Sequence, residues 1–145
     1  MVNSSKDISS FKDLNVWKKS RKVRQNISDL VETLPKEEKF RLKDQMIRAS
    51  RSVTANIAEG YGRFHYQENI QFCRQARGSL YELLDHLSCA LGEGYLSRDN
   101  LKNISQQIID CIKLLNGYIA YLKKAKQNHI TKEPTVKYES PPDNQ

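Results

Sequence analysis

Apolar residues recur at steps of three and four along four long segments of this 145-residue chain. The repeat is clearest in the last segment, where it consists of Leu101, Ile104, Ile108, Cys111, Leu115, Tyr118 and Leu122. Steps of three and four place side chains on one face of an α-helix. The periodicity therefore predicts four helices, over residues 13–34, 37–61, 65–92 and 97–127.

Proline and glycine separate these segments. Pro35 ends the first helix, because its ring disfavours the helical conformation of the residue before it. Its ring and the acidic residues after it suit the first turn of the next helix. Gly60 or Gly62 follows the second segment and Gly92 or Gly94 the third, and glycine often ends a helix. Short links make consecutive helices antiparallel, so we expect an all-α fold, an up-down-up-down antiparallel four-helix bundle.

The length suits one domain, which we place at residues 11–127. Residues 1–10 and 128–145 lack apolar periodicity, and we expect a flexible N-terminus and a disordered C-terminal tail. Three cysteines on apolar helical faces, Cys73, Cys89 and Cys111, predict packed, reduced thiols rather than a disulfide framework or a zinc site. The chain shows no signal peptide and no apolar run long enough to span a bilayer, so we expect a cytoplasmic protein without a membrane partner.

The formal net charge is +7 and the sequence pI is about 9.3, values compatible with a nucleic-acid partner. Basic residues crowd the outer side of the first helix, and others lie along the second. We predict that they bind phosphates of RNA or DNA without sequence preference, although such a run is also typical of a solvated helix face. The candidate nucleic-acid-binding residues are Lys18, Lys19, Arg21, Lys22, Arg24, Arg41, Lys43, Arg51 and Arg63.

A polar stripe runs beside the apolar face of the second helix, at the same spacing. Its amides, hydroxyl, arginines and carboxylate suit a partly buried hydrogen-bonded network better than a solvated surface, which remains the alternative. Gly78 in the third helix would permit close approach of a helix within the subunit or from a neighbouring one. The predicted polar network or oligomer interface consists of Gln45, Arg48, Ser52, Asn56, Glu59, Gly78, Ser79 and Glu82, and Arg63 continues the stripe.

No pattern typical of an enzyme emerges. Helical-bundle nucleases use an Arg followed four to six residues later by His, whereas Arg63 precedes His65 by two and Arg77 precedes His86 by nine. A di-iron bundle needs paired Glu-x-x-His motifs, and Glu82 and His86 miss that spacing. The chain also lacks a Gly-rich phosphate loop and a nucleophile signature. We therefore expect neither catalysis nor a cofactor or metal.

Several motifs carry a family resemblance. They are Phe11-x-Asp13-Leu14-x-Val16-Trp17, Gln45-x-x-Arg48-Ala49-x-x-Ser52, Asn56-Ile57-Ala58-Glu59-Gly60, Gly78-Ser79-x-x-Glu82-Leu83 and Gly94-Tyr95-Leu96. Between about Phe11 and Leu122 the chain resembles the four-helix-bundle proteins encoded by intervening sequences within bacterial 23S ribosomal RNA genes. Asn-Ile-Ala-Glu-Gly at the end of a long helix is the most specific of these motifs.

Proteins similar to this family include the accessory variability determinant of diversity-generating retroelements, a basic homopentamer that binds a reverse transcriptase and nucleic acid. The resemblance implies a homopentamer, contact with RNA or DNA, and a reverse transcriptase or ribosomal RNA as a further partner. We therefore expect a non-enzymatic accessory protein that binds nucleic acid. The alternative is a structural protein–protein scaffold without nucleic-acid contact.

Overall fold

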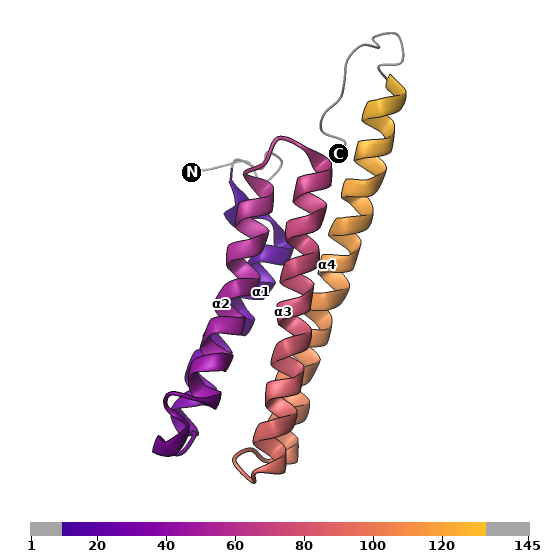
Figure 1. Ribbon diagram of the computed structural model, residues 1–145. Helices are drawn as coiled ribbons and strands as arrows, with labels where there is room; N and C mark the ends of the chain where they lie inside the picture. The colour runs from indigo at the N-terminus through magenta and orange to yellow at the C-terminus, as the bar shows by residue number, and fades with distance from the viewer. Residues whose placement is uncertain (1–9, 133–145) are drawn as a thin grey trace, which may run out of the picture.

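Four long helices build the computed structural model, which describes residues 10–132 (Figure 1). They are α1 (Asn15–Leu30), α2 (Leu42–Tyr61), α3 (Tyr66–Gly92) and α4 (Arg98–Lys132). Consecutive helices are antiparallel, and the described residues contain no strand. The expected all-α, four-helix bundle is confirmed.

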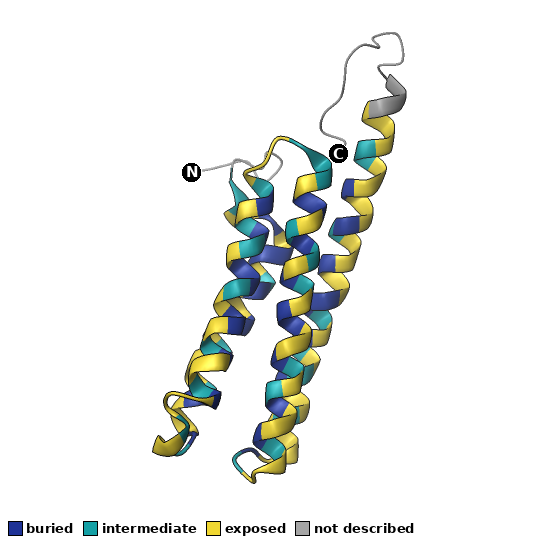
Figure 2. Ribbon diagram, viewed as in Figure 1, coloured by how far each residue is buried: buried dark blue, intermediate teal, exposed yellow. Residues whose placement is uncertain are grey.

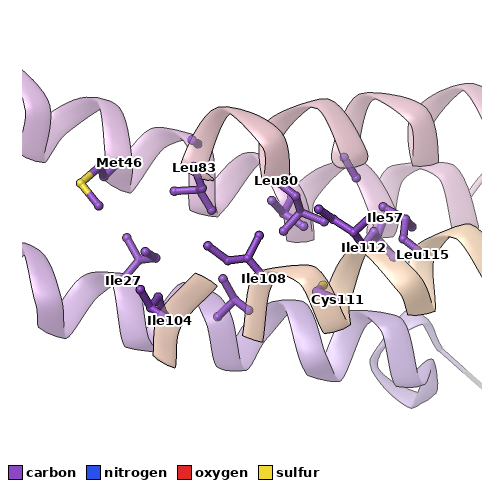
Figure 3. Close-up of a cluster of buried hydrophobic side chains, with 14 of the residues drawn as sticks. Ile27, Met46, Ile57, Leu80, Leu83, Ile104, Ile108, Cys111, Ile112 and Leu115 are labelled. Carbon is purple, nitrogen blue, oxygen red and sulfur yellow. The ribbon is translucent and has the colours of Figure 1, made fainter. Parts of the chain in front are cut away.

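Each helix packs against two others: α1 and α3 both contact α2 and α4. Their apolar faces meet in a single core whose central side chains include Ile27, Met46, Leu80 and Ile108, each fully buried (Figure 3). The buried residues line the inner sides of the helices, and the exposed residues cover the outer sides (Figure 2). The three-four spacing in the sequence thus identifies the core.

The start of α2 differs from its predicted position. Residues Lys36–Glu38 form a short 3-10 helix, and the α-helix begins at Leu42 rather than at residue 37. The Glu38 carboxylate accepts a hydrogen bond from the backbone N–H of Leu42 at 3.3 Å, which satisfies one unpaired donor at the helix start. The acidic residues after Pro35 therefore lie outside the first turn of α2, and one of them, Glu38, caps the helix from there.

The end of α1 also differs, because the α-helix ends at Leu30 and Val31–Thr33 form a 3-10 helix. The end of α4 is the third difference. The helix continues to Lys132, so the expected disordered tail is wrong for residues 128–132, while 133–145 and the expected flexible residues 1–9 lie outside the described residues. This extension projects past the ends of the other three helices (Figure 1). The preceding turn of α4 is attached to α3 by a hydrogen bond of 2.8 Å from Lys126 Nζ to Gln67 Oε1, and the ring of His129 in the extension meets that of Tyr66 edge to face.

The three cysteines are free thiols, as expected, but they are not all packed. Cys73 and Cys111 are buried, and burial raises the pKa of the Cys73 thiol to about 12. The Cys111 Sγ lies 3.0 Å from the Ser20 Oγ and joins α4 to α1. Cys89 is exposed, so its predicted burial is wrong: the apolar stripe of α3 near this position passes through Leu87 and Ala90 instead.

Residues 10–132 lack both a membrane-spanning helix and a metal-binding cluster. None of these helices is long and apolar enough to cross a membrane. Within the same residues, no group of three or more His, Cys, Asp and Glu side chains lies close enough to hold a metal ion.

Candidate nucleic-acid interface

The basic residues of α1 lie opposite its buried stripe. Val16, Ser20, Val23 and Ile27 face the core, which turns the side chains one and two positions away from them toward solvent. Lys18, Arg21 and Lys22 are accordingly exposed on consecutive turns. We call these three residues the α1 basic face. Arg21 lies over the Trp17 ring with 5.4 Å between its guanidinium carbon and the ring centroid, which fixes its direction.

Two arginines from different helices meet beside this face. Arg24 of α1 is half-buried and donates a hydrogen bond of 2.9 Å to Thr54 Oγ1 on α2. Arg51 of α2 is exposed and forms no ion pair or hydrogen bond through its side chain within residues 10–132. Both line a shallow hollow of about 150 Å³ together with Gln25, Ser28, Ile47 and Ser50. Guanidinium groups and hydroxyls are the groups that hold a phosphate in proteins.

The other predicted basic residues lie apart from this group. Lys43 forms an ion pair with Glu32 at 3.1 Å, and Arg41 lies 3.8 Å from Glu38, both near the turn between α1 and α2. Arg63 is at the opposite end of the bundle, where it pairs with Glu59 at 3.0 Å. Lys19 is half-buried on the side of α1 that faces Cys111. Of the nine, Lys18, Arg21 and Lys22 therefore share one face of α1, and Arg24 and Arg51 share one hollow, while the remaining four lie apart from that hollow.

The polar stripe of α2 forms a network only in its middle. Ser79 Oγ of α3 donates to Ser52 Oγ at 2.9 Å, and Asn56 Nδ2 donates to the same hydroxyl at 3.0 Å. Asn56 also donates to the Ser52 carbonyl at 2.9 Å. The other members are exposed. Arg48 pairs with Asp44 and Glu82 with His86 within their own helices, and Glu59 pairs with Arg63 just beyond the end of α2. Gln45 is exposed without a side-chain partner in the described part of the chain.

The close approach between helices occurs at Gly60 rather than at Gly78. A Cβ added at Gly60 would lie 2.6 Å from Asn69 Oδ1 and 3.0 Å from the Phe72 Cβ of α3. A Cβ at Gly78 would meet no atom of the described residues within 4 Å. A helix of the same subunit therefore does not pack on Gly78, and only contact with another subunit remains as a role for it.

A second hollow was missed by the sequence analysis. It has a volume of about 640 Å³ and lies where α1 and α3 begin and α2 ends, against the side of α4. Five aromatic rings line it, from Tyr61, Phe64, Tyr66, Tyr118 and Tyr121. They come from the ends of two helices, the link between them and the middle of α4. The sequence holds one local indication of this hollow, which is the pair Tyr118 and Tyr121, one turn apart in α4.

Fold and surface define a class of protein: a basic four-helix bundle with cationic side chains gathered along α1 and α2. The chain belongs to the 23S rRNA-intervening sequence protein family, whose model matches residues 12–117. It is also similar to a structurally characterised protein of unknown function from the S23 ribosomal protein family of Bacteroides thetaiotaomicron. That match has 25% sequence identity and a TM-score of 0.68, and covers 72% of this chain and 95% of the other. No curated protein matches the chain.

Proposed function

We propose that this protein is a non-enzymatic accessory protein of the cytoplasm that binds RNA or DNA through the α1 basic face. The observation that carries the proposal is the run of exposed cations on the α1 basic face, followed along the same helix by Arg24, which shares a hollow with Arg51 of α2, so that two helices supply cations. Lys18, Lys22 and Arg51 form no ion pair within the described residues, so their charges are available to phosphates.

The groups on this surface favour recognition of the phosphate backbone rather than of base sequence. Exposed Lys and Arg side chains contact phosphates, which position a nucleic acid but carry no sequence information. The one aromatic ring of the cluster, Trp17, is buried under Arg21 and offers no face to a base. Binding at the α1 basic face is therefore expected to be non-specific and to depend strongly on salt.

Assembly is the second part of the proposal. A homopentamer would repeat the α1 basic face around a ring and multiply the contacts with one nucleic acid. Exposed apolar side chains that support an interface occur on α4, at Ile109 and Leu114, and on α3, at Tyr81. Residues 65–96 carry four acidic and two basic side chains, which also suits a neighbour's basic surface. Ribosomal RNA or a reverse transcriptase with its template is the partner we propose for this assembly.

The test is the salt dependence of binding. For the unmodified protein, the logarithm of the binding constant is expected to fall with log salt by about 0.7–0.9 per phosphate contacted. Replacing Lys18 and Lys22 by Gln removes two contacts and is expected to lower that slope by about 1.4–1.8. The matched control replaces Lys102 and Lys113, two exposed lysines of α4, and changes the net charge equally.

Equal slopes for the two double variants would place the contact elsewhere. Absence of RNA and DNA binding even at low salt would refute the proposal and favour the protein–protein scaffold. Fluorescence anisotropy with a labelled strand, at several salt concentrations, measures these quantities directly.

A further inference from the structure

The aromatic hollow owes its shape to the unequal lengths of the helices. Near it α1 and α3 begin and α2 ends, whereas α4 continues to Lys132 (Figure 1). One wall of the hollow is therefore a stretch of α4 that no other helix covers completely. On this wall, Leu114 is 42% exposed and Tyr121 is 64% exposed.

Flat rings face this opening from two sides. Tyr118 and Tyr121 are stacked, with 6.3 Å between their centroids and 11° between their planes. Phe64, in the link between α2 and α3, lines the same hollow and is 97% exposed. Such large apolar surfaces are usually buried unless a ligand covers them. The space between them, about 640 Å³, is within the range of small-molecule sites and can hold a base with its sugar.

Polar and charged groups surround the rings. Asn69 Nδ2 donates to the Tyr118 hydroxyl at 3.3 Å, which fixes the orientation of the ring. Arg63, which also pairs with Glu59, lines the hollow together with the carboxylate of Asp13. An adjoining hollow of about 360 Å³ shares Tyr66 and Tyr121 and adds Lys124. Aromatic rings flanked by cations are the arrangement with which proteins hold a base and its phosphate.

We infer that this hollow binds a nucleobase of single-stranded RNA or DNA, stacked on Tyr121 and Phe64, with the adjoining phosphates near Arg63 and Lys124. A duplex keeps its bases stacked inside, so only an unpaired strand can supply the ring. The cations on the rim complement a phosphate backbone, which favours a nucleic acid over a protein segment as occupant. The inference rests on the proposed function and adds to it a preference for unpaired bases.

The test compares an oligouridine strand with an abasic strand of the same length and charge. The unmodified protein is expected to bind the oligouridine more tightly, since only this strand can stack. Tyr121→Ala and Phe64→Ala are each expected to weaken oligouridine binding about tenfold and to leave abasic-strand binding unchanged. The matched control is Phe40→Ala in the turn at the opposite end of the bundle, which is also exposed in the free protein. It is expected to change the binding of neither strand.

The outcomes separate the inference from the proposed function. If the two strands bind equally well and tightly, the proposed function stands and the hollow is not a base site, which leaves it to a protein partner. If Tyr121→Ala weakens both strands equally, the residue acts on the fold or on charge, and the inference is overturned. If neither the single strands nor a duplex bind the protein, the inference and the proposed function are both overturned. A photocrosslink from 4-thiouridine to the peptide that carries Tyr118 and Tyr121 would be independent support.

Discussion

At the residue scale, Gly60 shows how tightly α2 and α3 pack. An alanine at this position would place its Cβ 2.6 Å from Asn69 Oδ1 and 3.1 Å from the Asn69 carbonyl oxygen. The amide oxygen could rotate away, but the carbonyl and the Phe72 Cβ are fixed by the helix. Moving Asn69 would also disturb its hydrogen bonds with Tyr118 and Cys73. We expect Gly60→Ala to lower the free energy of unfolding by about 1–3 kcal/mol through overpacking.

Urea unfolding followed by circular dichroism measures this change, and Gly78→Ala is the matched control. Gly78 is helical and has open space around its missing Cβ, so alanine there is expected to raise the free energy of unfolding by up to about 1 kcal/mol. Equal effects at the two positions would contradict the difference in packing.

The same pair of glycines shows what the sequence could not determine. Gly78 falls within a periodic helix and Gly60 near a helix end, so the sequence predicts close approach at Gly78 and a helix end at Gly60 or Gly62. Helix α2 ends at Tyr61 with Gly62 after it, as predicted, but Gly60 also faces α3 at close range. Periodicity gives the direction of each side chain around its own axis, but not the distance between two axes. Small differences in that distance decide which glycine is needed.

At the element scale, one hydrogen bond joins the two links at the same end of the bundle. The Tyr95 hydroxyl, after α3, donates to Glu38 Oε2, before α2, at 2.9 Å. This bond lowers the pKa of Glu38 from its ordinary value of 4.5, with help from the Leu42 N–H, and raises the pKa of Tyr95 above 10. Glu38 thus contributes stability above pH 4.5 that is lost as the pH falls through its lowered pKa. Tyr95 contributes stability below pH 10 that is lost as the pH rises through its raised pKa.

We therefore expect Tyr95→Phe to lower the Tm most between those two pH values. The difference from the unmodified protein is expected to narrow in acid, where Glu38 is protonated, and in strong base, where Tyr95 is ionised. Thermal unfolding across the pH range measures it, and Tyr81→Phe, at an exposed tyrosine, is the control. A pH-independent difference would show that the bond is not coupled to either ionisation.

Element identity was predictable from the sequence, and so were the end of α2, both ends of α3 and the start of α4, whereas the end of α1, the start of α2 and the end of α4 were not. The heptad of α4 and the stripes of the other helices identified all four, because burial of one face imposes the spacing. The start of α2 was displaced by a carboxylate that caps the helix from a preceding 3-10 turn. In the candidate site, Lys18 and Lys22 share one face of α1, as their spacing of four residues predicts. Arg41 and Arg63 were predicted to lie near them, but the 20 residues of α2 carry these two arginines to opposite ends of the bundle.

At the scale of the whole molecule, the two candidate surfaces differ in chemistry and position. The α1 basic face offers charge without rings, and the aromatic hollow at one end of the bundle offers rings with few charges. A strand that used both would be held by its backbone along α1 and by an unpaired base at the end. Such a division gives affinity that depends on salt together with selectivity for unpaired nucleic acid.

Gly78 provides a direct test of assembly. Within the subunit, the space around its missing Cβ is empty, so Gly78→Leu is expected to leave the helical content and the Tm of the subunit unchanged or slightly raised. If the proposed homopentamer packs a neighbouring helix on this surface, the leucine would hold the two subunits apart, and native mass spectrometry is expected to show monomer in place of pentamer. Gly92→Leu, at another helical glycine of α3 with open space around it, is the control and is expected to keep the pentamer. If the Gly78→Leu variant stays pentameric, the surface around Gly78 is not part of the subunit interface. If the unmodified protein is itself a monomer, the proposed pentamer is refuted.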